Sequence, residues 1–211
     1  MRQLDYVEGW VHGWAHSRVT SAPVEIEGGW AIDTGMTRES RRYVLHTPTA
    51  EQVESIVESS PPPYACIKYV GGPSWESLFS TGWVRTDPAW FMLREITVAA
   101  AVAAPDGYDV RTVQASDTLL TTEIRTTAGE LAARGQIGLG QVFVVPDQIV
   151  TEDSHRRRGL GSVVMNHLEQ GALRAGRTRA VLGATSDGRA LYTRLGWTTA
   201  AELTGYYHRP G

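Results

Sequence analysis

The chain has little cysteine, little net charge and no long apolar run. Its single cysteine, Cys66, excludes a disulfide within the 211 residues and is typical of a reducing compartment. A formal net charge of −3 argues against sequence-blind attraction to nucleic acid or anionic membranes. The longest apolar run, residues 96–104, is about half of what a membrane span requires. We therefore expect a cytoplasmic protein with no nucleic-acid partner and no membrane partner.

Candidate reactive groups are also sparse. Cys66 stands in an apolar run, whereas reactive cysteines need an electropositive setting, so we interpret it as a small core residue. The six histidines show no metal-ligand spacing, and we expect no metal. The first residues, Met1-Arg2-Gln3-Leu4-Asp5, show no apolar signal segment.

The composition does support a folded core. Apolar residues make up 42% and charged residues 20%, as in soluble globular proteins, and the length suits one large domain or two small ones. Ala103-Ala104-Pro105-Asp106-Gly107 is rich in turn formers. We place a boundary there, between an N-terminal α/β region at residues 1–104 and a second domain at residues 105–211.

Residues 1–104 contain short elements separated by glycine and proline. Apolar residues at helical spacing predict a helix at the N-terminus. Thr49-Ala50-Glu51-Gln52 has capping-box spacing and predicts a second helix. A short helix is expected at residues 74–80, and strands are expected at residues 24–26, 30–32, 42–46, 64–70 and 90–96.

Residues 105–211 begin with successive strands and then alternate strands with helices. The expected order is strands at 108–113, 119–125, 131–137 and 141–151, a helix at 159–175, a strand at 179–185, a helix capped by Ser186, and a strand from Trp197. Pro146 predicts a bulge or a break in the fourth strand. Short strand–helix–strand crossovers imply parallel pairing, so we expect a mixed α/β sheet.

The most informative segment, residues 147–162, reads as a strand, a basic turn with two glycines and a helix N-terminus. The first turn of a helix has unpaired N–H groups and partial positive charge, and glycine lets an oxyanion approach the backbone. Arg156, Arg157 and Arg158 add charge. The pattern predicts a pyrophosphate site, although it is neither a P-loop nor a dinucleotide fingerprint. The alternatives are a solvated turn and a nucleic-acid contact, which the net charge disfavours.

Arg156-Arg157-Arg158-Gly159-Leu160-Gly161 resembles the [Q/R]-x-x-G-x-[G/A] signature of the GNAT superfamily of N-acetyltransferases. Ile149-Val150-Thr151 resembles the fourth strand of that family, residues 179–185 its fifth strand and residues 188–197 its "lYeklGF" element. The resemblance implies a mixed, mostly antiparallel twisted sheet flanked by helices, here with an N-terminal α/β extension. It also implies acetyl transfer from acetyl-CoA to a primary amine of a small molecule, directly in a ternary complex.

The resemblance assigns the cofactor-binding residues. Ile149, Val150 and Thr151 would pair with the pantetheine arm like an added strand. The pyrophosphate would be held by Arg156, Arg157, Arg158, Gly159, Leu160, Gly161 and Ser162. The pairing with pantetheine needs a strand without a neighbour on one side, and divergence of the fifth strand would provide that gap.

Three further residues are assigned catalytic roles. Tyr192 matches the family's tyrosine, the general acid toward the departing thiolate; the alternative is a core tyrosine at a helix end. Asp147 is the first candidate for the base, on the same side of its strand as Ile149 and Thr151 by alternation. Glu152 is the second. A cap or a surface carboxylate is the alternative for both acids.

One departure concerns the acceptor side. The usual fold has two helices between its first two strands, and the gap between Val113 and Leu119 leaves no room for them. We expect the N-terminal region, which holds six of the seven tryptophans, to cover that side. These residues are Trp10, Trp14, Trp30, Trp75, Trp83 and Trp90. The alternative is that they simply form its core.

An internal echo and several questions stay open. Residues 78–83 resemble residues 191–197, as a short helix stopped by glycine before a tryptophan-led strand. Chance explains this, or else the N-terminal half is a partial, degenerate GNAT-like repeat. A non-catalytic acyl-CoA-binding sensor or scaffold is the alternative function. The acceptor, the acyl chain length and the oligomeric state, a homodimer included, are not decided by the sequence.

Overall fold

The computed structural model describes residues 2–59, 62–71, 75–79, 82–98 and 100–209. Helices and strands follow each other as α1 (Gln3–Arg18), β1 (Val24–Ile26), β2 (Gly29–Met36), β3 (Glu39–Leu45), α2 (Ala50–Glu58), β4 (Ala65–Val70), a 3-10 turn (Glu76–Leu78), β5 (Trp83–Arg85), β6 (Ala89–Glu95), β7 (Tyr108–Ser116), β8 (Leu119–Thr126), β9 (Leu131–Leu139), β10 (Val144–Thr151), a 3-10 turn (Asp153–His155), α3 (Leu160–Arg174), β11 (Arg179–Thr185), α4 (Ser186–Arg194) and β12 (Thr198–His208).

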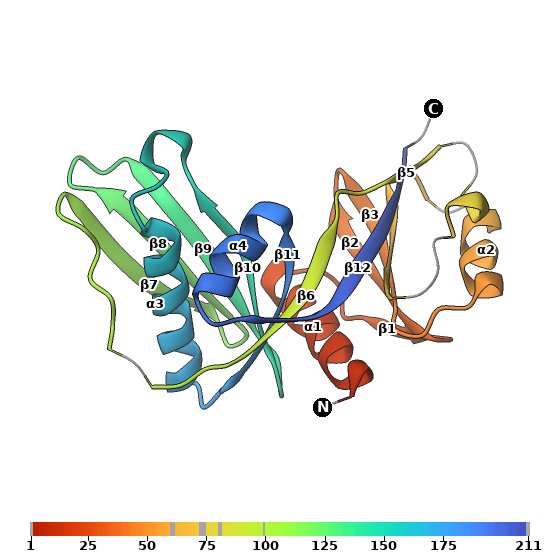
Figure 1. Cartoon of the computed structure of the whole chain (residues 1–211), viewed down its shortest axis with the longest axis horizontal. Helices are drawn as coiled ribbons and strands as arrows, with labels where there is room; N and C mark the ends of the chain where they lie inside the picture. The colour runs from red at the N-terminus through yellow and green to blue at the C-terminus, as the bar shows by residue number, and fades with distance from the viewer. Residues whose placement is uncertain (1, 60–61, 72–74, 80–81, 99, 210–211) are drawn as a thin grey trace.

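The strands form one sheet in the order β1-β2-β3-β4-β12-β6-β11-β10-β9-β8-β7, with β5 beside β12 (Figure 1). Among the described strands, β3–β4 and β10–β11 are parallel and the other pairs are antiparallel. The expected mixed, mostly antiparallel sheet flanked by helices is therefore confirmed.

Two strands, β6 and β12, cross between the halves of the molecule (Figure 1). β6 comes from the N-terminal half of the sequence but lies between β11 and β12, and β12 lies between β6 and β4. The expectation that β11 and β12 are parallel neighbours was wrong, because β6 fills the place between them. Since residues on both sides of position 104 share one sheet, the proposed boundary stays a prediction.

Both halves use the same connectivity. In the first, the antiparallel pair β2–β3 is followed by α2 and by β4, which is parallel to β3. In the second, the antiparallel pair β9–β10 is followed by α3 and by β11, which is parallel to β10. This correspondence favours the repeat interpretation over chance. Ser74, Ser80 and Thr81 of the expected short helix and echo lie outside the described residues.

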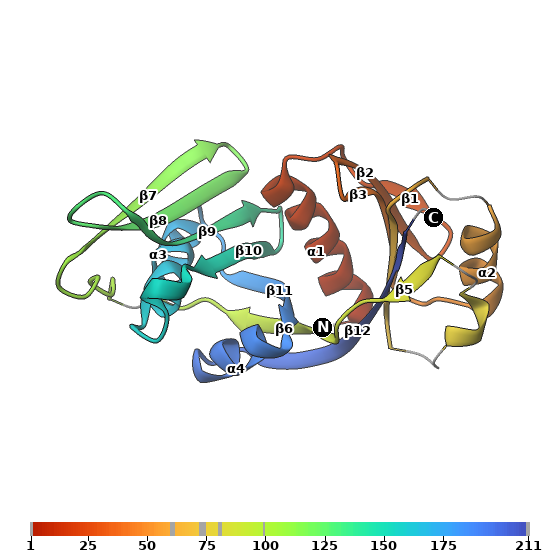
Figure 2. The same cartoon turned by 90° about the horizontal axis from the view of Figure 1, so that it is seen from above.

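Helix α1 covers the side of the sheet for which the sequence offered no local helices (Figure 2). It packs on β9, β10 and β11, and its Trp10 and Trp14 join Val145 in one apolar cluster. On the opposite face, α3 packs against Val144 and its neighbours in a second cluster. The backbones of α1 and β9 nearly touch, because a Cβ added to Gly138 would stand 1.9 Å from the carbonyl oxygen of Gly13.

Two tryptophans of the N-terminal half, Trp10 and Trp14, pack against strands of the C-terminal half. Trp30, Trp75 and Trp83 pack nearer to their own half. Trp10, Trp14 and Trp30 are buried, while Trp75 and Trp83 pack against a third cluster around Tyr69. Cys66 is buried as expected, and burial raises the pKa of its thiol.

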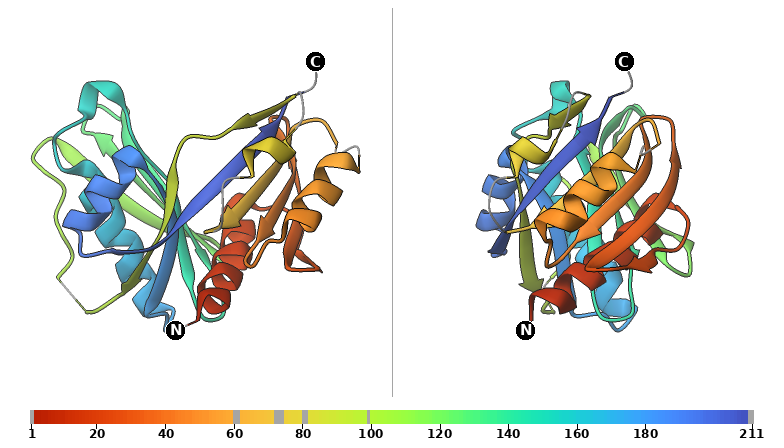
Figure 3. Two further views of the ribbon diagram at one scale, coloured as in Figure 1. Left: turned by 45° about the vertical axis from the view of Figure 1, so that its right-hand side comes forward. Right: turned by 90° about the vertical axis from the view of Figure 1, so that its right-hand side faces the viewer.

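The two parts of the sheet diverge from a base made by α1 and β6, so the molecule has a V shape (Figure 3).

Helix caps agree with the sequence at α2, where the Thr49 hydroxyl accepts a hydrogen bond from the Gln52 amide. At α4 the cap is Thr185 rather than Ser186, and its hydroxyl accepts the Gly188 amide at 3.3 Å. None of the described helices could cross a membrane.

Candidate functional site

The site begins where β10 and β11 separate. They pair only at Val144 and Ala180, and beyond that point β10 is bonded to β9 alone among the described strands. The backbone groups of β10 that face β11 are therefore left without a strand partner. The gap expected beside the fourth strand is present, and an extended ligand could pair with this edge as an added strand.

A bulge in β10 sets which side chains face each side of the gap. Its register with β9 shifts between Asp147 and Val150, and Gln148 has a φ of 53°. The break predicted from Pro146 is thus found just after it. Because a bulge reverses alternation, Ile149 packs in the cluster on the α3 side, whereas Asp147 bonds to Arg18 of α1. The expectation that these two side chains share one side was wrong.

The start of α3 forms the cradle that the sequence predicted. Gly159 caps it with a φ of 78° and no side-chain hydrogen bond, and its first turn contains no acid. Arg157 has a φ of 61°, which is uncommon for a residue other than glycine and is typical of functional loops. The amides of Leu160 and Gly161 have no intrahelical acceptors, so they can donate to an anion, whereas the Ser162 amide donates to the Gly159 carbonyl at 3.0 Å.

The three arginines have different surroundings. Arg156 pairs with Asp153 at 2.8 Å, and Arg157 forms no ion pair among the described residues. Arg158 instead donates to the Tyr108 hydroxyl at 2.8 Å and to the Ser154 carbonyl at 3.1 Å. The same hydroxyl lies 2.9 Å from Nδ1 of the buried His155. Arg158 and His155 therefore brace the turn.

The gap and the cradle border one cavity of about 880 Å³. It is lined by Arg18, Pro146, Asp147, Gln148, Ile149, Val150, Thr151, Arg156, Arg157, Gly159, Leu160, Gly161, Ser162, Gly183, Thr185, Asp187, Gly188, Leu191, Tyr192 and Arg194. All the residues expected to bind the cofactor line it except Arg158. Of the three candidate catalytic residues, Tyr192 and Asp147 line it and Glu152 does not.

Comparisons with known proteins agree with this geometry. Residues 138–205, which include the gap, the cradle and α4, match the model of the FR47-like protein family. A GCN5-related N-acetyltransferase from Kribbella flavida has 16% identity and a TM-score of 0.69, with 98% of this chain and 95% of that chain covered.

Two further solved structures span nearly the whole chain. A GCN5-related N-acetyltransferase-like protein from Streptococcus suis has 13% identity, a TM-score of 0.62 and 98% of both chains covered. A tandem GNAT protein from the clavulanic acid biosynthesis pathway has 11% identity and a TM-score of 0.55, with 99% of this chain and 95% of that chain covered. No curated protein matches the chain.

The protein has the GNAT fold. The resemblance that the sequence suggested for residues after 108 is confirmed, and the structural match extends over the N-terminal half as well.

Tyr192, the residue matched to the family's tyrosine, is on the helix beside the cavity. It lies on α4 with 9% of its surface exposed and lines the cavity. Burial, followed by the nearby charge of Asp147, raises the pKa of its phenol to about 12. The phenol therefore keeps its proton at neutral pH and can donate it to a group in the cavity.

Asp147 is engaged rather than open. Its carboxylate accepts hydrogen bonds from Nε and Nη2 of Arg18, the latter at 3.1 Å, and from the Ser17 hydroxyl at 3.3 Å. Any further group that uses this carboxylate must share it with Arg18 and Ser17 or reach it through water. Glu152 is exposed and starts the 3-10 turn outside the cavity, with its amide bonded to the Ala132 carbonyl at 2.9 Å.

Arg18, Asp187 and Arg194 also line the cavity, and the sequence did not point to them. Arg18 meets Asp147 across 129 positions of sequence, so no local pattern could reveal the pair. The positive charge of Arg194 comes from the last turn of α4, where a basic residue is common for helix stability alone.

Proposed function

We propose that the protein is an N-acetyltransferase that moves an acetyl group from acetyl-CoA to a primary amine of a small molecule, directly in a ternary complex. One observation carries this: the unpaired edge of β10 and the uncapped start of α3 border the same cavity, which reaches Tyr192. That cavity offers a peptide-like edge, an anion cradle and a proton donor in succession.

Each part of the cavity has a role in this proposal. The backbone of β10 from Ile149 to Thr151 pairs with the pantetheine amides. The amides from Arg157 to Ser162, together with the Arg156 and Arg157 guanidinium groups, hold the diphosphate. Acetyl-CoA, when bound, supplies an activated thioester.

The proton transfers follow from the two side chains at the end of the cavity. The amine nitrogen forms a bond to the acetyl carbon while the carbon–sulfur bond breaks. Tyr192 gives its phenolic proton to the departing sulfur, and Asp147 takes the amine proton directly or through water. Glu152, outside the lining, is the second candidate for that base.

Acetyl-CoA binding and turnover test this assignment separately. We expect calorimetry to detect acetyl-CoA uptake and an amine panel to release thiol. Tyr192→Phe should lower kcat at least about tenfold, because the general acid is lost, while the Kd for acetyl-CoA changes little. An equal loss of kcat and of affinity would contradict the role of Tyr192, and no uptake of CoA would refute the proposal.

A non-catalytic acyl-CoA sensor is the second candidate. It is favoured by one observation, that Asp147 is held by Arg18 and Ser17 while Glu152 lies outside the cavity. A sensor would bind acetyl-CoA with the same residues but would release no thiol with any amine.

A further inference from the structure

Lys68 is the only lysine in the chain. It lies on β4, on the face that also carries Val70, which packs in the same cluster as α1. Its ammonium donates to the Thr86 hydroxyl at 3.2 Å. Gly205 of β12 makes room for it, since a Cβ at Gly205 would stand 2.6 Å from the Lys68 nitrogen.

No carboxylate pairs with Lys68 among the described residues. The nearby Glu39 is already bound by Arg42, with Nε–Oε1 and Nη2–Oε2 distances of 2.6 and 2.9 Å. Enclosure lowers the pKa of the Lys68 ammonium. An ammonium has three donors and Thr86 accepts one, so a further acceptor, best an anion, is missing.

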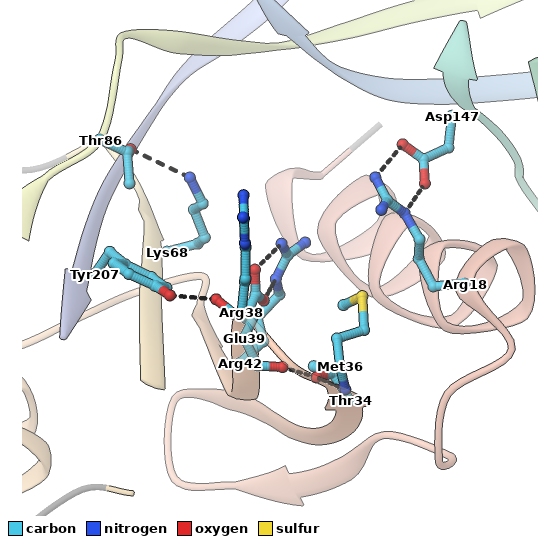
Figure 4. A network of polar contacts seen from close by, with 10 residues as sticks. All are labelled: Arg18, Thr34, Met36, Arg38, Glu39, Arg42, Lys68, Thr86, Asp147 and Tyr207. Atoms are coloured by element: carbon cyan, nitrogen blue, oxygen red, sulfur yellow. Dashed lines mark hydrogen bonds and ion pairs between the residues drawn. The ribbon is translucent and has the colours of Figure 1, made fainter. Parts of the chain in front are cut away.

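The environment of Lys68 joins the candidate active site through Trp14. The Arg42 guanidinium lies 3.7 Å from the centre of the Trp14 ring, and that of Arg18 lies 5.6 Å from it. Arg18 in turn holds Asp147 at the end of the cavity. Figure 4 shows Lys68, Arg42, Arg18 and Asp147, with the exposed Arg38, between the two parts of the sheet.

The cluster of Arg38, Arg42 and Lys68 with Glu39 and the nearby Asp87 has three basic and two acidic residues. Each carboxylate in Figure 4, Glu39 and Asp147, is matched by one arginine. Lys68 and Arg38 form no ion pair among the residues described, so an anion that reached Lys68 would stabilise the charged form of its amine.

We propose that the acceptor amine carries an anionic group, a carboxylate or a phosphate, which binds the Lys68 ammonium while the amine faces Asp147. This inference rests on the proposed function and names its substrate class. The N-terminal half then contributes the acceptor's recognition and the C-terminal half contributes the acetyl donor.

The single lysine gives a test that needs no turnover. Protein labelled with ¹³C and ¹⁵N in lysine should give one ε-methylene signal, from Lys68. We expect it to move when α-amino acids or phosphoethanolamine are added to the acetyl-CoA-loaded protein, and to stay in place with α-amino amides or ethanolamine. The acid and phosphate arms decide which anion is preferred. Equal shifts with the neutral amines, or no shift with any anionic amine, would overturn the inference.

Kinetics with matched variants provide the second test. Lys68→Met should raise KM for anionic amines at least about tenfold and leave KM for neutral amines unchanged, whereas Lys68→Arg should restore part of the preference. Arg111→Met, on the edge strand β7, removes a similar charge elsewhere and should change neither KM.

The outcomes separate this inference from the function beneath it. If neutral and anionic amines are acetylated equally well by the wild type, or if Lys68→Met affects both equally, the acceptor class is wrong and the acetyltransferase stands. If no amine of either kind accepts acetyl although acetyl-CoA binds, the proposed function falls and the acceptor class falls with it.

Discussion

The two halves of the molecule share a connectivity but differ at the place where a ligand would enter. In the N-terminal half, β3 and β4 pair at five positions, from Arg41–Ala65 to Leu45–Tyr69. In the C-terminal half, β10 and β11 pair at one position and then separate. The two parallel strands of this strand–helix–strand unit are thus paired along their length in one half and separated after one pair in the other.

The helices after these strands differ in the same sense. The start of α2 is satisfied by its own capping box of Thr49 and Gln52, and Glu51 puts an acid in its first turn. The hollow beside it, about 450 Å³, is lined by Glu27 and Glu51. The start of α3 has no side-chain cap, no acid and arginines before it. Connectivity alone does not make an anion site; the unpaired amides and the local charge do.

A third difference lies in the echoed segments. Phe79 corresponds to Tyr192, and its ring stacks on that of Tyr206 with centroids 3.5 Å apart, within the packing of the N-terminal half. The N-terminal half therefore lacks the hydroxyl as well as the gap and the cradle. It keeps a polar cluster that contains Lys68 and the buried Arg42 (Figure 4).

The largest expected effect comes from separating the halves. β6 belongs to the N-terminal half of the sequence but lies between β11 and β12 of the C-terminal half. Residues 105–211 alone would therefore lack the strand between β11 and β12, and the apolar surface that α1 covers would be exposed. We expect this fragment not to fold alone and to fold when co-expressed with residues 1–104, as measured by circular dichroism and gel filtration. A cooperative thermal transition of the isolated fragment would show that the halves are independent.

The contact of α1 with β9 can be broken by one methyl group. Gly138→Ala should lower the free energy of unfolding by about 3 kcal/mol or more, because its Cβ would meet backbone atoms of α1 that cannot move aside. Gly161→Ala is the control, since its Cβ would lie 3.4 Å from the nearest atom, an ordinary contact. Equal urea midpoints for Gly138→Ala and the wild type would contradict the tight docking of α1.

The first turn of α3 can be given the acid that the first turn of α2 contains. Gly161→Glu puts an acid at the position that Glu51 holds in α2, and should weaken acetyl-CoA binding at least about tenfold through repulsion of the diphosphate. Calorimetry measures this, with Gly161→Ala as the uncharged control. Glu51→Gln, the reverse change in the N-terminal half, should leave the Kd for acetyl-CoA as it is; a clear change would mean that α2 takes part in binding.

The parts of this comparison that the sequence predicted are those encoded locally. The Arg156–Gly161 turn, the capping box at Thr49 and the bulge signalled by Pro146 depend on residues close together in the chain. The insertion of β6 between β11 and β12 depends on pairing between distant segments. The sequence of β11 alone does not decide between β6 and β12 as its neighbour, because an apolar strand can pair with either. The reversal of Asp147 depends on where in β10 the bulge falls, which Pro146 does not specify. The pairing of Asp147 with Arg18 and the contact of Lys68 with Thr86 join segments that are far apart in the chain, so no local pattern predicted them.

The smallest effect concerns the hydroxyl that distinguishes Tyr192 from Phe79. Burial and then the Asp147 charge raise the pKa of Tyr192 to about 12. Between about pH 10 and 12 the folded protein therefore keeps this proton, whereas the unfolded chain, with a tyrosine pKa of about 10, has lost it. The resulting stability is complete below about pH 10 and is lost as the pH rises through about 12.

Absorbance of phenolate against pH tests this directly. Wild type and Tyr192→Phe should give the same curve up to about pH 10, since only the more accessible tyrosines ionise there, and should diverge above it. For the same reason, loss of the Tyr192 proton should not limit turnover at moderately alkaline pH, so any fall of kcat below pH 10 must come from another group. If the Tyr192→Phe curve already fell below the wild-type curve at about pH 10, the phenol of Tyr192 would be exposed to water and its pKa would not be raised. The cavity around Tyr192 would then differ less from the surroundings of Phe79 than the structure indicates.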